Sequence, residues 1–151
     1  MMISKRFNVR VYGLCINHQQ NILICDEHYG NQFFTKFPGG GLEFGEGIIQ
    51  CLKREWKEEL NIEIEVLSHF YTTEFFQASA FDGSQVISIY YLVKPSEMSL
   101  DEFTSYTHLL KNEETLFKWA SLKKMKESDV TFPIDQKVAS LLIERHASGC
   151  F

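Results

Sequence analysis

The sequence has no excess of positive charge. Its 15 lysine and arginine residues are outnumbered by 20 aspartate and glutamate residues, so the formal net charge is −5 at pH 7. Non-specific binding to a phosphate backbone needs clustered cations, and we therefore expect no nucleic-acid polymer as a partner. A phosphorylated small molecule is compatible with this charge, because a bound metal ion supplies positive charge locally.

Long apolar runs and closely spaced cysteines are also missing. The first residues, MMISKRFNVRV, lack the apolar run of a signal peptide, and no stretch approaches the length that spans a bilayer. None of the four cysteines belongs to a Cys-x-x-Cys clip, and the five histidines lack metal-ligand spacing, which argues against a structural zinc site. We expect a cytoplasmic protein that does not associate with membranes and has free thiols at Cys15, Cys25, Cys51 and Cys150.

What the chain does contain fits one compact domain. A length of 151 residues, with 44% hydrophobic and 23% charged residues, is ordinary for a soluble domain. No internal repeat, low-complexity tract or linker interrupts the sequence. We therefore expect a single domain over residues 1–151.

Strands dominate the predicted secondary structure. Segments rich in β-formers predict strands over residues 7–17, 21–26, 62–71, 72–80, 85–94 and 114–120. The first two resemble a hairpin around a polar turn. We expect a loop over residues 27–31, and Pro38 with the three glycines after it is expected to stop regular structure. Asp82-Gly83 is a hairpin signal.

The clearest helix is predicted over residues 47–60. Its apolar side chains recur at steps of three and four and form one stripe, made of Ile49, Leu52, Trp56 and Leu60. Asn61 follows, and asparagine is the best non-glycine residue for a left-handed helix stop.

A second helix is predicted to begin at Pro133, with a similar apolar spacing after it. Residues 96–113 are polar and mixed and predict a loop with about one helical turn. Many strands around two main helices predict the α+β class, with a mixed sheet between helices.

The first helix carries three glutamates in an unfavourable position. Glu55, Glu58 and Glu59 occupy one arc about 100° wide beside the apolar stripe. Like charges at these spacings destabilise a helix, and the C-terminal end of the helix dipole disfavours them as well. A cation among the carboxylates would offset both effects, and hard oxygen ligands suit Mg²⁺ or Mn²⁺. Taken alone, glutamates on a helix are most often a solvated face.

Two neighbouring features favour a ligand site over a solvated face. A loop of Gly39, Gly40 and Gly41 precedes the helix, and its backbone can approach a ligand closely because it lacks side chains. Such a loop offers N–H groups for phosphate and carbonyl groups for metal. Arg54, beside the carboxylates, can hold one of them or the loop through a bidentate hydrogen bond.

These residues resemble the Nudix box. In that pattern a glycine is followed by five residues, Glu, seven residues, Arg-Glu, a bulky apolar residue, any residue, Glu-Glu, any residue, Gly and a bulky apolar residue. A chance match to six fixed positions is on the order of one in ten million per start position. The one departure is Asn61 in place of glycine, and asparagine tolerates the left-handed conformation. We refer to residues 40–62 as the box; its six matching anchors are Gly40, Glu46, Arg54, Glu55, Glu58 and Glu59.

The resemblance implies a Nudix-type α/β/α sandwich with a mixed β-sheet between helices. It also implies that water attacks phosphorus and cleaves a diphosphate bond in a nucleoside diphosphate-linked compound or a nucleoside triphosphate. Glu55, Glu58 and Glu59 would bind one to three Mg²⁺ ions, or Mn²⁺ in their place, helped by the main-chain carbonyl of Gly39. The family further suggests a homodimer.

The resemblance also implies a general base that takes the proton from water. Glu55 is the preferred candidate, with Arg54 beside it as the second catalytic residue. Some members of the family use a glutamate from a distant loop instead. Glu113 and Glu114 are candidates for that role, although surface charge is the simpler explanation for both.

Three alternatives stay open. A Nudix-like module that binds or senses a nucleotide without cleaving it would be indicated by loss of a box glutamate, and none is lost. A simple acidic metal-binding protein would leave the glycine loop and Arg54 unexplained. A diphosphate isomerase on the same fold would need further cysteine and glutamate features that the sequence does not place.

The substrate is not readable from the sequence. The proline of the ADP-ribose type, the tyrosine of the diadenosine polyphosphate type and the signatures of the NADH and coenzyme A types are all missing after the box. Several phenylalanines could stack on a base, but core packing is the simpler expectation for Phe33, Phe34, Phe75, Phe76 and Phe81.

Overall fold

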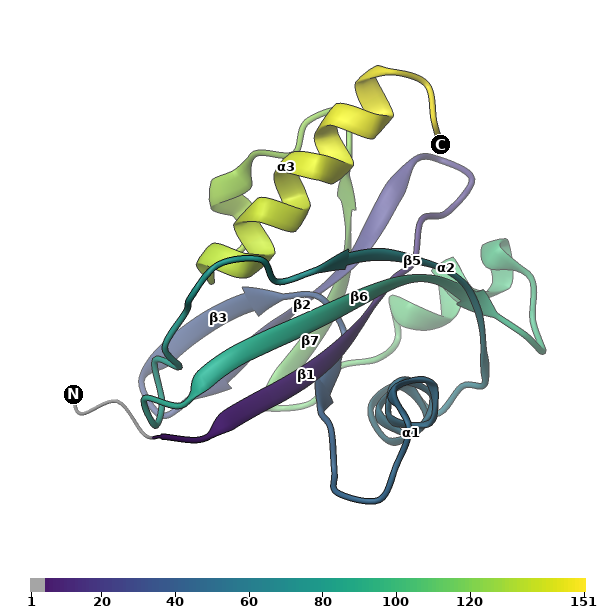
Figure 1. Ribbon diagram of the computed structural model, residues 1–151. Helices are drawn as coiled ribbons and strands as arrows, with labels where there is room; N and C mark the ends of the chain where they lie inside the picture. Colours follow the sequence, from purple (N-terminus) through teal and green to yellow (C-terminus); the bar gives the residue numbers. More distant parts are fainter. Residues whose placement is uncertain (1–4) are drawn as a thin grey trace.

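The computed structural model describes residues 5–151 and contains two β-sheets with helices on both sides (Figure 1). The strands are β1 (Phe7–Leu14), β2 (Asn21–Tyr29), β3 (Gln32–Lys36), β4 (Gly39–Gly41), β5 (Ile64–Thr72), β6 (Gln85–Pro95) and β7 (Thr115–Ser121). The helices are α1 (Ile48–Leu60), α2 (Leu100–Thr107), the short 3-10 helix η1 (Glu127–Asp129) and α3 (Pro133–Ala147). The α+β class predicted from the sequence is confirmed.

The larger sheet is mixed and has the strand order β4-β1-β6-β5. β1 runs parallel to β6, whereas β4 is antiparallel to β1 and β5 is antiparallel to β6. The parallel register places Arg10 beside Ser88 and Tyr12 beside Tyr90. The smaller sheet is antiparallel and has the order β3-β2-β7.

β1 and β2 do not form the predicted hairpin. They belong to different sheets, and only the base of the turn between them is paired, through a bridge between Ile16 and Ile22. β2 instead forms a hairpin with β3 across a tight turn at Gly30, which has a positive φ of 61°. Its other neighbour is β7, from much later in the chain. Pairing between distant segments decides this arrangement, and local alternation of side chains does not encode it.

Several other local predictions are wrong. β2 continues to Tyr29 through most of the loop expected over residues 27–31, and the glycines after Pro38 pair with β1 as β4. No strand follows Thr72 in the range predicted up to residue 80, where Ala78 makes only an isolated bridge.

α2 is a full helix in the region predicted to be mostly loop. It begins after Ser99, whose side chain accepts a hydrogen bond from the Glu102 N–H at 3.1 Å. Phe103 is its buried contact with the core, and the Tyr106 hydroxyl donates to the Leu60 carbonyl at 2.7 Å. Tertiary contacts of this kind stabilise a helix whose polar sequence gives little local signal.

α1 and α3 cover opposite sides of the sheets (Figure 1). On the α1 side, Leu52, Trp56 and Leu60 are fully buried in a cluster with side chains from β1, β2 and α2. The predicted stripe is confirmed except for Ile49, which is 38% exposed. Asn61 ends α1 with φ 54°, the left-handed conformation expected of a glycine substitute.

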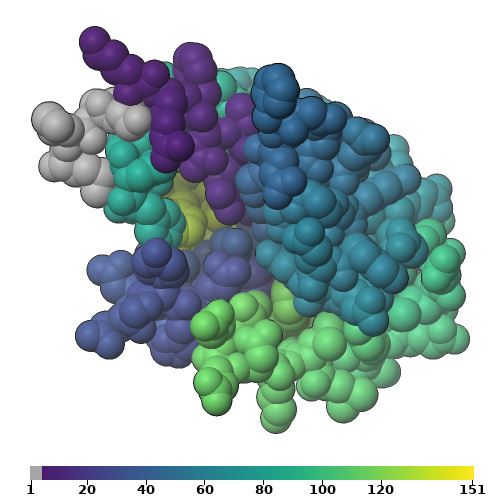
Figure 2. Space-filling view, turned by 90° about the horizontal axis from the view of Figure 1, so that it is seen from below, coloured from purple at the N-terminus to yellow at the C-terminus, as the bar shows by residue number. Residues whose placement is uncertain are grey.

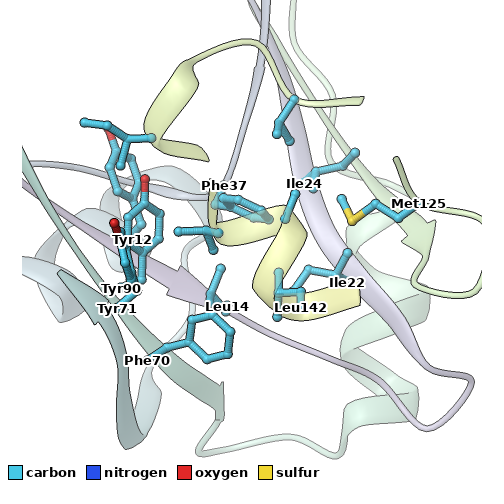
Figure 3. Close-up of a cluster of buried hydrophobic side chains, with 14 of the residues drawn as sticks. Tyr12, Leu14, Ile22, Ile24, Phe37, Phe70, Tyr71, Tyr90, Met125 and Leu142 are labelled. Atoms are coloured by element: carbon cyan, nitrogen blue, oxygen red, sulfur yellow. The ribbon is translucent and has the colours of Figure 1, made fainter. Parts of the chain in front are cut away.

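On the α3 side, apolar residues of α3 pack on β1, β2, β5 and β6. Figure 3 shows Tyr12, Tyr71 and Tyr90 gathered together in this cluster, next to Leu14 and Phe37. The ring centroids of Tyr12 and Tyr90 are 5.3 Å apart in a stacked arrangement.

The cysteines are free thiols, as predicted, and only Cys150 is exposed. Within residues 5–151, no helix has the length and apolar character needed to cross a membrane.

Candidate active site

The glycine loop packs directly on α1. Gly39 has φ +153°, and a Cβ there would collide with the backbone of β1. Gly40 lies against Glu55, whose carboxyl group occupies the space that a Cβ would need. The Trp56 indole N–H donates to the Pro38 carbonyl at 3.2 Å and holds the start of the loop against the helix. Only glycine at position 40 lets the Glu55 carboxylate lie on the loop backbone.

Arg54 joins the loop, the segment before the helix and the box glutamates. Its Nε and Nη2 donate to the two carboxylate oxygens of Glu46 at 2.9 and 2.7 Å. Nη2 also donates to the Gly41 carbonyl at 3.1 Å. Nη1 lies 3.1 Å from Glu55 Oε1 and 3.2 Å from Glu58 Oε2. A planar guanidinium can serve all these acceptors at once, which an ammonium cannot do.

Glu46 is an acceptor for Arg54 and not a proton carrier. Hydrogen bonds from Arg54 and from the Glu43 N–H lower the pKa of Glu46 to about 2. The hydrogen bonds of Arg54 to Glu46, together with the charges of Glu55 and Glu43, raise the pKa of Arg54. Both groups therefore stay charged at neutral pH.

Glu59 lies in a different environment. Its Oε2 is buried and has no hydrogen-bond partner in the part of the chain that the structure describes. Burial raises the pKa of Glu59 to about 7; Glu55 and Glu27 add to this effect, while Lys36 and Arg10 oppose it. A buried carboxylate oxygen without a partner is costly, so a proton or a cation is needed at this point.

The predicted metal ligands do not close around one point. Within residues 5–151, no three acidic, histidine or cysteine side chains are gathered closely enough to hold a metal ion as they stand. Two of the box carboxylates, Glu55 and Glu58, point to Arg54 Nη1 instead. The donor set still fits a hard divalent cation, because it consists of carboxylate oxygens and Glu59 Oε2 has no hydrogen-bond partner among residues 5–151.

A cleft opens next to the box, between the β1–β6 pair and the β2–β3 hairpin. In Figure 2 it is the hollow between the purple β1 and the indigo hairpin, with yellow-green α3 at its base. It encloses about 190 Å³ and is open to solvent. Small-molecule sites enclose roughly 300–1,000 Å³, so the cleft itself has room for only part of a ligand of that size.

Alternate residues of three strands face the cleft, because successive side chains of a strand point to opposite faces. These residues are Asn8, Arg10 and Tyr12 of β1, Val86, Ser88 and Tyr90 of β6, and Phe34 and Lys36 of β3.

Arg10 connects the cleft to the glycine loop. Its Nε donates to the Tyr12 hydroxyl at 2.6 Å, and its Nη1 is the nearest atom to the place where a Cβ on Gly41 would lie. Burial alone would lower the pKa of Arg10, but Tyr12 and the nearby Glu55 and Glu27 raise it overall.

Lys36 is the second cation of the cleft. Its Nζ lies 3.2 Å from Glu27 Oε2, and its side chain is 9% exposed. Burial alone would lower the pKa of Lys36, but Tyr12, Cys25, Glu27 and Glu59 together raise it. Since Glu59 belongs to the box, the charges of the cleft and of the box act on each other.

Asp135, at the start of α3, lies at the inner end of the cleft and is 3% exposed. The Tyr90 hydroxyl donates to Asp135 Oδ1 at 2.5 Å. Burial raises the pKa of Asp135 to about 6, against the opposing effect of this hydrogen bond. The cleft thus ends in a buried acid that is close to its titration midpoint near neutral pH.

Aromatic rings surround the opening of the cleft. Phe34 stacks on Phe132 with centroids 5.2 Å apart, and Phe81 meets Phe34 edge-on at 5.2 Å. The expectation of core packing is wrong for four phenylalanines, which are 42–61% exposed: Phe33, Phe75, Phe76 and Phe81. Of the five candidates for base stacking, only Phe34 and Phe81 line the cleft.

Glu113 and Glu114 are exposed and lie just before β7. The Glu114 carbonyl accepts from the His28 N–H at 2.8 Å, and its N–H donates to Asn112 Oδ1 at 2.9 Å. Their role as an additional carboxylate stays a prediction.

The motif that predicted the site does not include Arg10, Lys36, Tyr90 or Asp135. A signal was present in β1, where Arg10 alternates with valines, because a polar residue on one face of a buried strand needs a partner there. Lys36 is likewise a lone cation beside Phe34 and Phe37.

Comparisons with known proteins agree with the family that the box residues predict. Residues 5–141 match the family model described as the NUDIX domain. No curated protein sequence is similar enough to match the chain.

Solved structures do match. The ORF135 protein of E. coli superposes with a TM-score of 0.72 at 19% identity, over 95% of this chain and 94% of that one. A NUDIX hydrolase from Nitrosomonas europaea gives 0.68 at 20% identity, over 95% and 90% of the two chains. The MutT protein of Methanosarcina mazei Go1 gives 0.65 at 18% identity, over 96% and 99%.

At these identities the structural likeness shows the fold, and the family model supplies the sequence relationship. The match spans both the box and the strands that form the cleft. The chain therefore belongs to the NUDIX family and is a Nudix pyrophosphohydrolase.

Proposed function

We propose that this enzyme uses Mg²⁺ to hydrolyse a diphosphate bond in a nucleoside diphosphate-linked compound or a nucleoside triphosphate. The observation that carries the proposal is Glu59 Oε2, which is buried without a hydrogen-bond partner among the described residues. A divalent cation at this point would be its missing partner. Mn²⁺ would fit the same oxygen donors.

The proposed metal ligands are the carboxylates of Glu55, Glu58 and Glu59 and the main-chain carbonyl of Gly39. When bound, the metal neutralises phosphate charge and makes the phosphorus more electrophilic. Arg54 positions Glu55 and Glu58 through the hydrogen bonds of its Nη1, at 3.1 and 3.2 Å.

Glu55 is proposed to take the proton from the attacking water. Its carboxyl group is fixed against Gly40, so the base has a defined position relative to the loop. The N–H groups of Gly40 and Gly41 are proposed to contact the phosphates. Glu113 and Glu114 are the candidates for the base if Glu55 serves only the metal.

The cleft is proposed to orient the substrate by its two chemically different ends. Phe34, Phe81 and Phe132 supply flat apolar surface for a ring at the opening. Arg10 and Lys36 supply positive charge at the other end, where both interact electrostatically with Glu59 of the box. A ring at the aromatic end would direct its phosphate chain toward the box glutamates.

The test is a phosphate-release screen with Mg²⁺ over nucleoside triphosphates, nucleotide sugars and dinucleotides. At least one compound should be hydrolysed, and Glu58→Gln or Glu59→Gln should lower its turnover by orders of magnitude, roughly 10²–10⁴-fold. Glu63→Gln is the matched control, because Glu63 lies just beyond α1 and its ion pair is with Lys57, at 3.5 Å. Near wild-type turnover of either box variant would show that the ligand assignment is wrong.

A further inference from the structure

Lys36 is a buried cation whose position the box does not explain. Its side chain is 9% exposed, and its one ion-pair partner among residues 5–151 is Glu27, which is 33% exposed. Lysine is almost never buried unless it is paired, because removing an ammonium group from water is costly. An apolar side chain at this position would avoid that cost, so stability alone does not account for the charge.

The location of Lys36 is specific. It is the last residue of β3, two positions after Phe34 on the same face of the strand and three positions before Gly39. The chain thus passes from the aromatic opening of the cleft, through Lys36, into the glycine loop. A ligand that reaches from the opening to the loop has to pass this ammonium group.

The groups around Lys36 leave room for an anion. Glu27 of β2, Glu59 of α1 and Asp135 of α3 are the carboxylates that interact with it, whereas Tyr12 and Cys25 have raised pKa values and are neutral at pH 7. An ammonium group has three N–H donors, and one ion-pair partner occupies one direction. The remaining donors are available to oxygen atoms of a ligand in the cleft.

We propose that Lys36, held in place by Glu27, binds the phosphate chain of the substrate and stabilises the leaving phosphate. In the hydrolysis, the water oxygen forms a bond to phosphorus and the bridging P–O bond breaks. The electron pair of that bond stays on the bridging oxygen, and the water proton goes to the general base. Lys36 remains protonated throughout and donates a hydrogen bond to the oxygen that gains the charge. This inference rests on the proposed function, because it assumes a diphosphate in the cleft.

The direct test is the binding of inorganic pyrophosphate, measured by calorimetry in Mg²⁺ and in EDTA. Lys36→Met keeps the length of the side chain and removes the charge, and it should raise the Kd at least about tenfold. Lys36→Arg should restore most of the affinity. Glu58→Gln should weaken binding only in Mg²⁺, so the result in EDTA separates the phosphate contact from the metal site.

Lys118→Met is the matched control. Lys118 lies on β7, pairs with Asp26 at 2.8 Å and does not line the cleft. This variant should bind pyrophosphate like the wild type. A Lys36→Met variant with wild-type affinity overturns the proposal, and so does a wild-type protein that binds pyrophosphate in neither buffer.

Kinetics and unfolding separate substrate contact from a structural role. Once a substrate is known, Lys36→Met should lower kcat by more than it raises KM, because the leaving phosphate gains charge only in the transition state. Its melting temperature should stay close to that of the wild type. A lower melting temperature combined with unchanged kcat would assign Lys36 to the fold and overturn the proposal.

Discussion

Arg54 holds Glu46 with one hydrogen bond to each carboxylate oxygen, at 2.9 Å from Nε and 2.7 Å from Nη2. The two residues are eight positions apart, on α1 and on the segment that precedes it. Because Nη2 also reaches the Gly41 carbonyl, this pair fastens the glycine loop to the glutamate helix. The positions of Glu55 and Glu58 therefore depend on a fork-shaped side chain at position 54.

Replacing Arg54 by lysine should disturb the site more than the fold. We expect Arg54→Lys to lower kcat/KM by about 10²-fold, since an ammonium group cannot serve Glu46, Glu55 and Glu58 together. Steady-state kinetics on the substrate found in the screen measures this effect. Lys53→Ala, at an exposed neighbouring position of α1, should leave kcat/KM unchanged. Equal activity of the Arg54→Lys and wild-type enzymes would contradict the positioning role.

A single methyl group at Gly40 should displace Glu55. The Cβ of Gly40→Ala would occupy the space of the Glu55 carboxyl group, and we expect turnover to fall at least about tenfold. Gly47→Ala is the control, because its Cβ would lie 3.3 Å from Gln50 Oε1, where a flexible side chain can move. Turnover assays on both variants make the comparison. A Gly40→Ala enzyme as active as Gly47→Ala would show that the contact with Glu55 is unimportant.

Divalent metal should stabilise the folded protein. At a Mg²⁺ concentration of about 100 times its Kd, binding adds about 2.7 kcal/mol to the free energy of unfolding, which corresponds to roughly 5–10 °C in a domain of this size. Thermal melts in Mg²⁺ and in EDTA measure the shift. Glu59→Gln should abolish it, and Glu63→Gln should retain it. A wild-type melting curve that does not respond to Mg²⁺ would count heavily against the metal site.

Asp135 should make stability fall as the pH rises. Burial raises its pKa from the ordinary 3.8 to about 6, so the folded state holds this proton more tightly than the unfolded state does. The stabilisation is complete below about pH 4 and is lost as the pH rises through 6, a change of about 3 kcal/mol. Urea unfolding between pH 4 and 7 measures it.

Asp135→Asn should remove this pH-dependent contribution. Asparagine keeps an oxygen acceptor for the Tyr90 hydroxyl but does not ionise. As the pH rises from 4 to 7, the free energy of unfolding of the Asp135→Asn variant should therefore increase relative to that of the wild type. Glu127→Gln, at an exposed position on η1, should follow the wild-type profile. A difference between Asp135→Asn and wild type that is constant with pH would contradict the buried titration.

The box helix was predictable because its signals are local. The apolar stripe through Leu52, Trp56 and Leu60 and the left-handed stop at Asn61 depend only on residues within a few turns of one another. The spacing from Gly40 to Glu59 likewise identified the family, since six fixed positions rarely coincide by chance. Ile49 is exposed because the face of the helix that packs on the sheets is narrower than the stripe of apolar residues in the sequence.

Sheet membership and the cleft were not predictable in the same way. β1 and β2 have similar local patterns, yet β1 pairs with β6 and β2 with β7, across long stretches of chain. Arg10, Lys36 and Asp135 come from three elements that meet only in the folded molecule. α2 was missed for the same reason, because buried contacts such as that of Phe103 stabilise it.

The sequence by itself determined which residues carry the chemistry of the box and that they share one helix. Tertiary structure decided where their charges lie: burial leaves Glu59 Oε2 without a hydrogen-bond partner in the described part of the chain, while Arg54 contacts Glu55 and Glu58. It also decided that a cationic, aromatic cleft adjoins them. The physical reason is that periodicity acts over one or two turns, whereas burial and electrostatic environment depend on segments that only folding brings together.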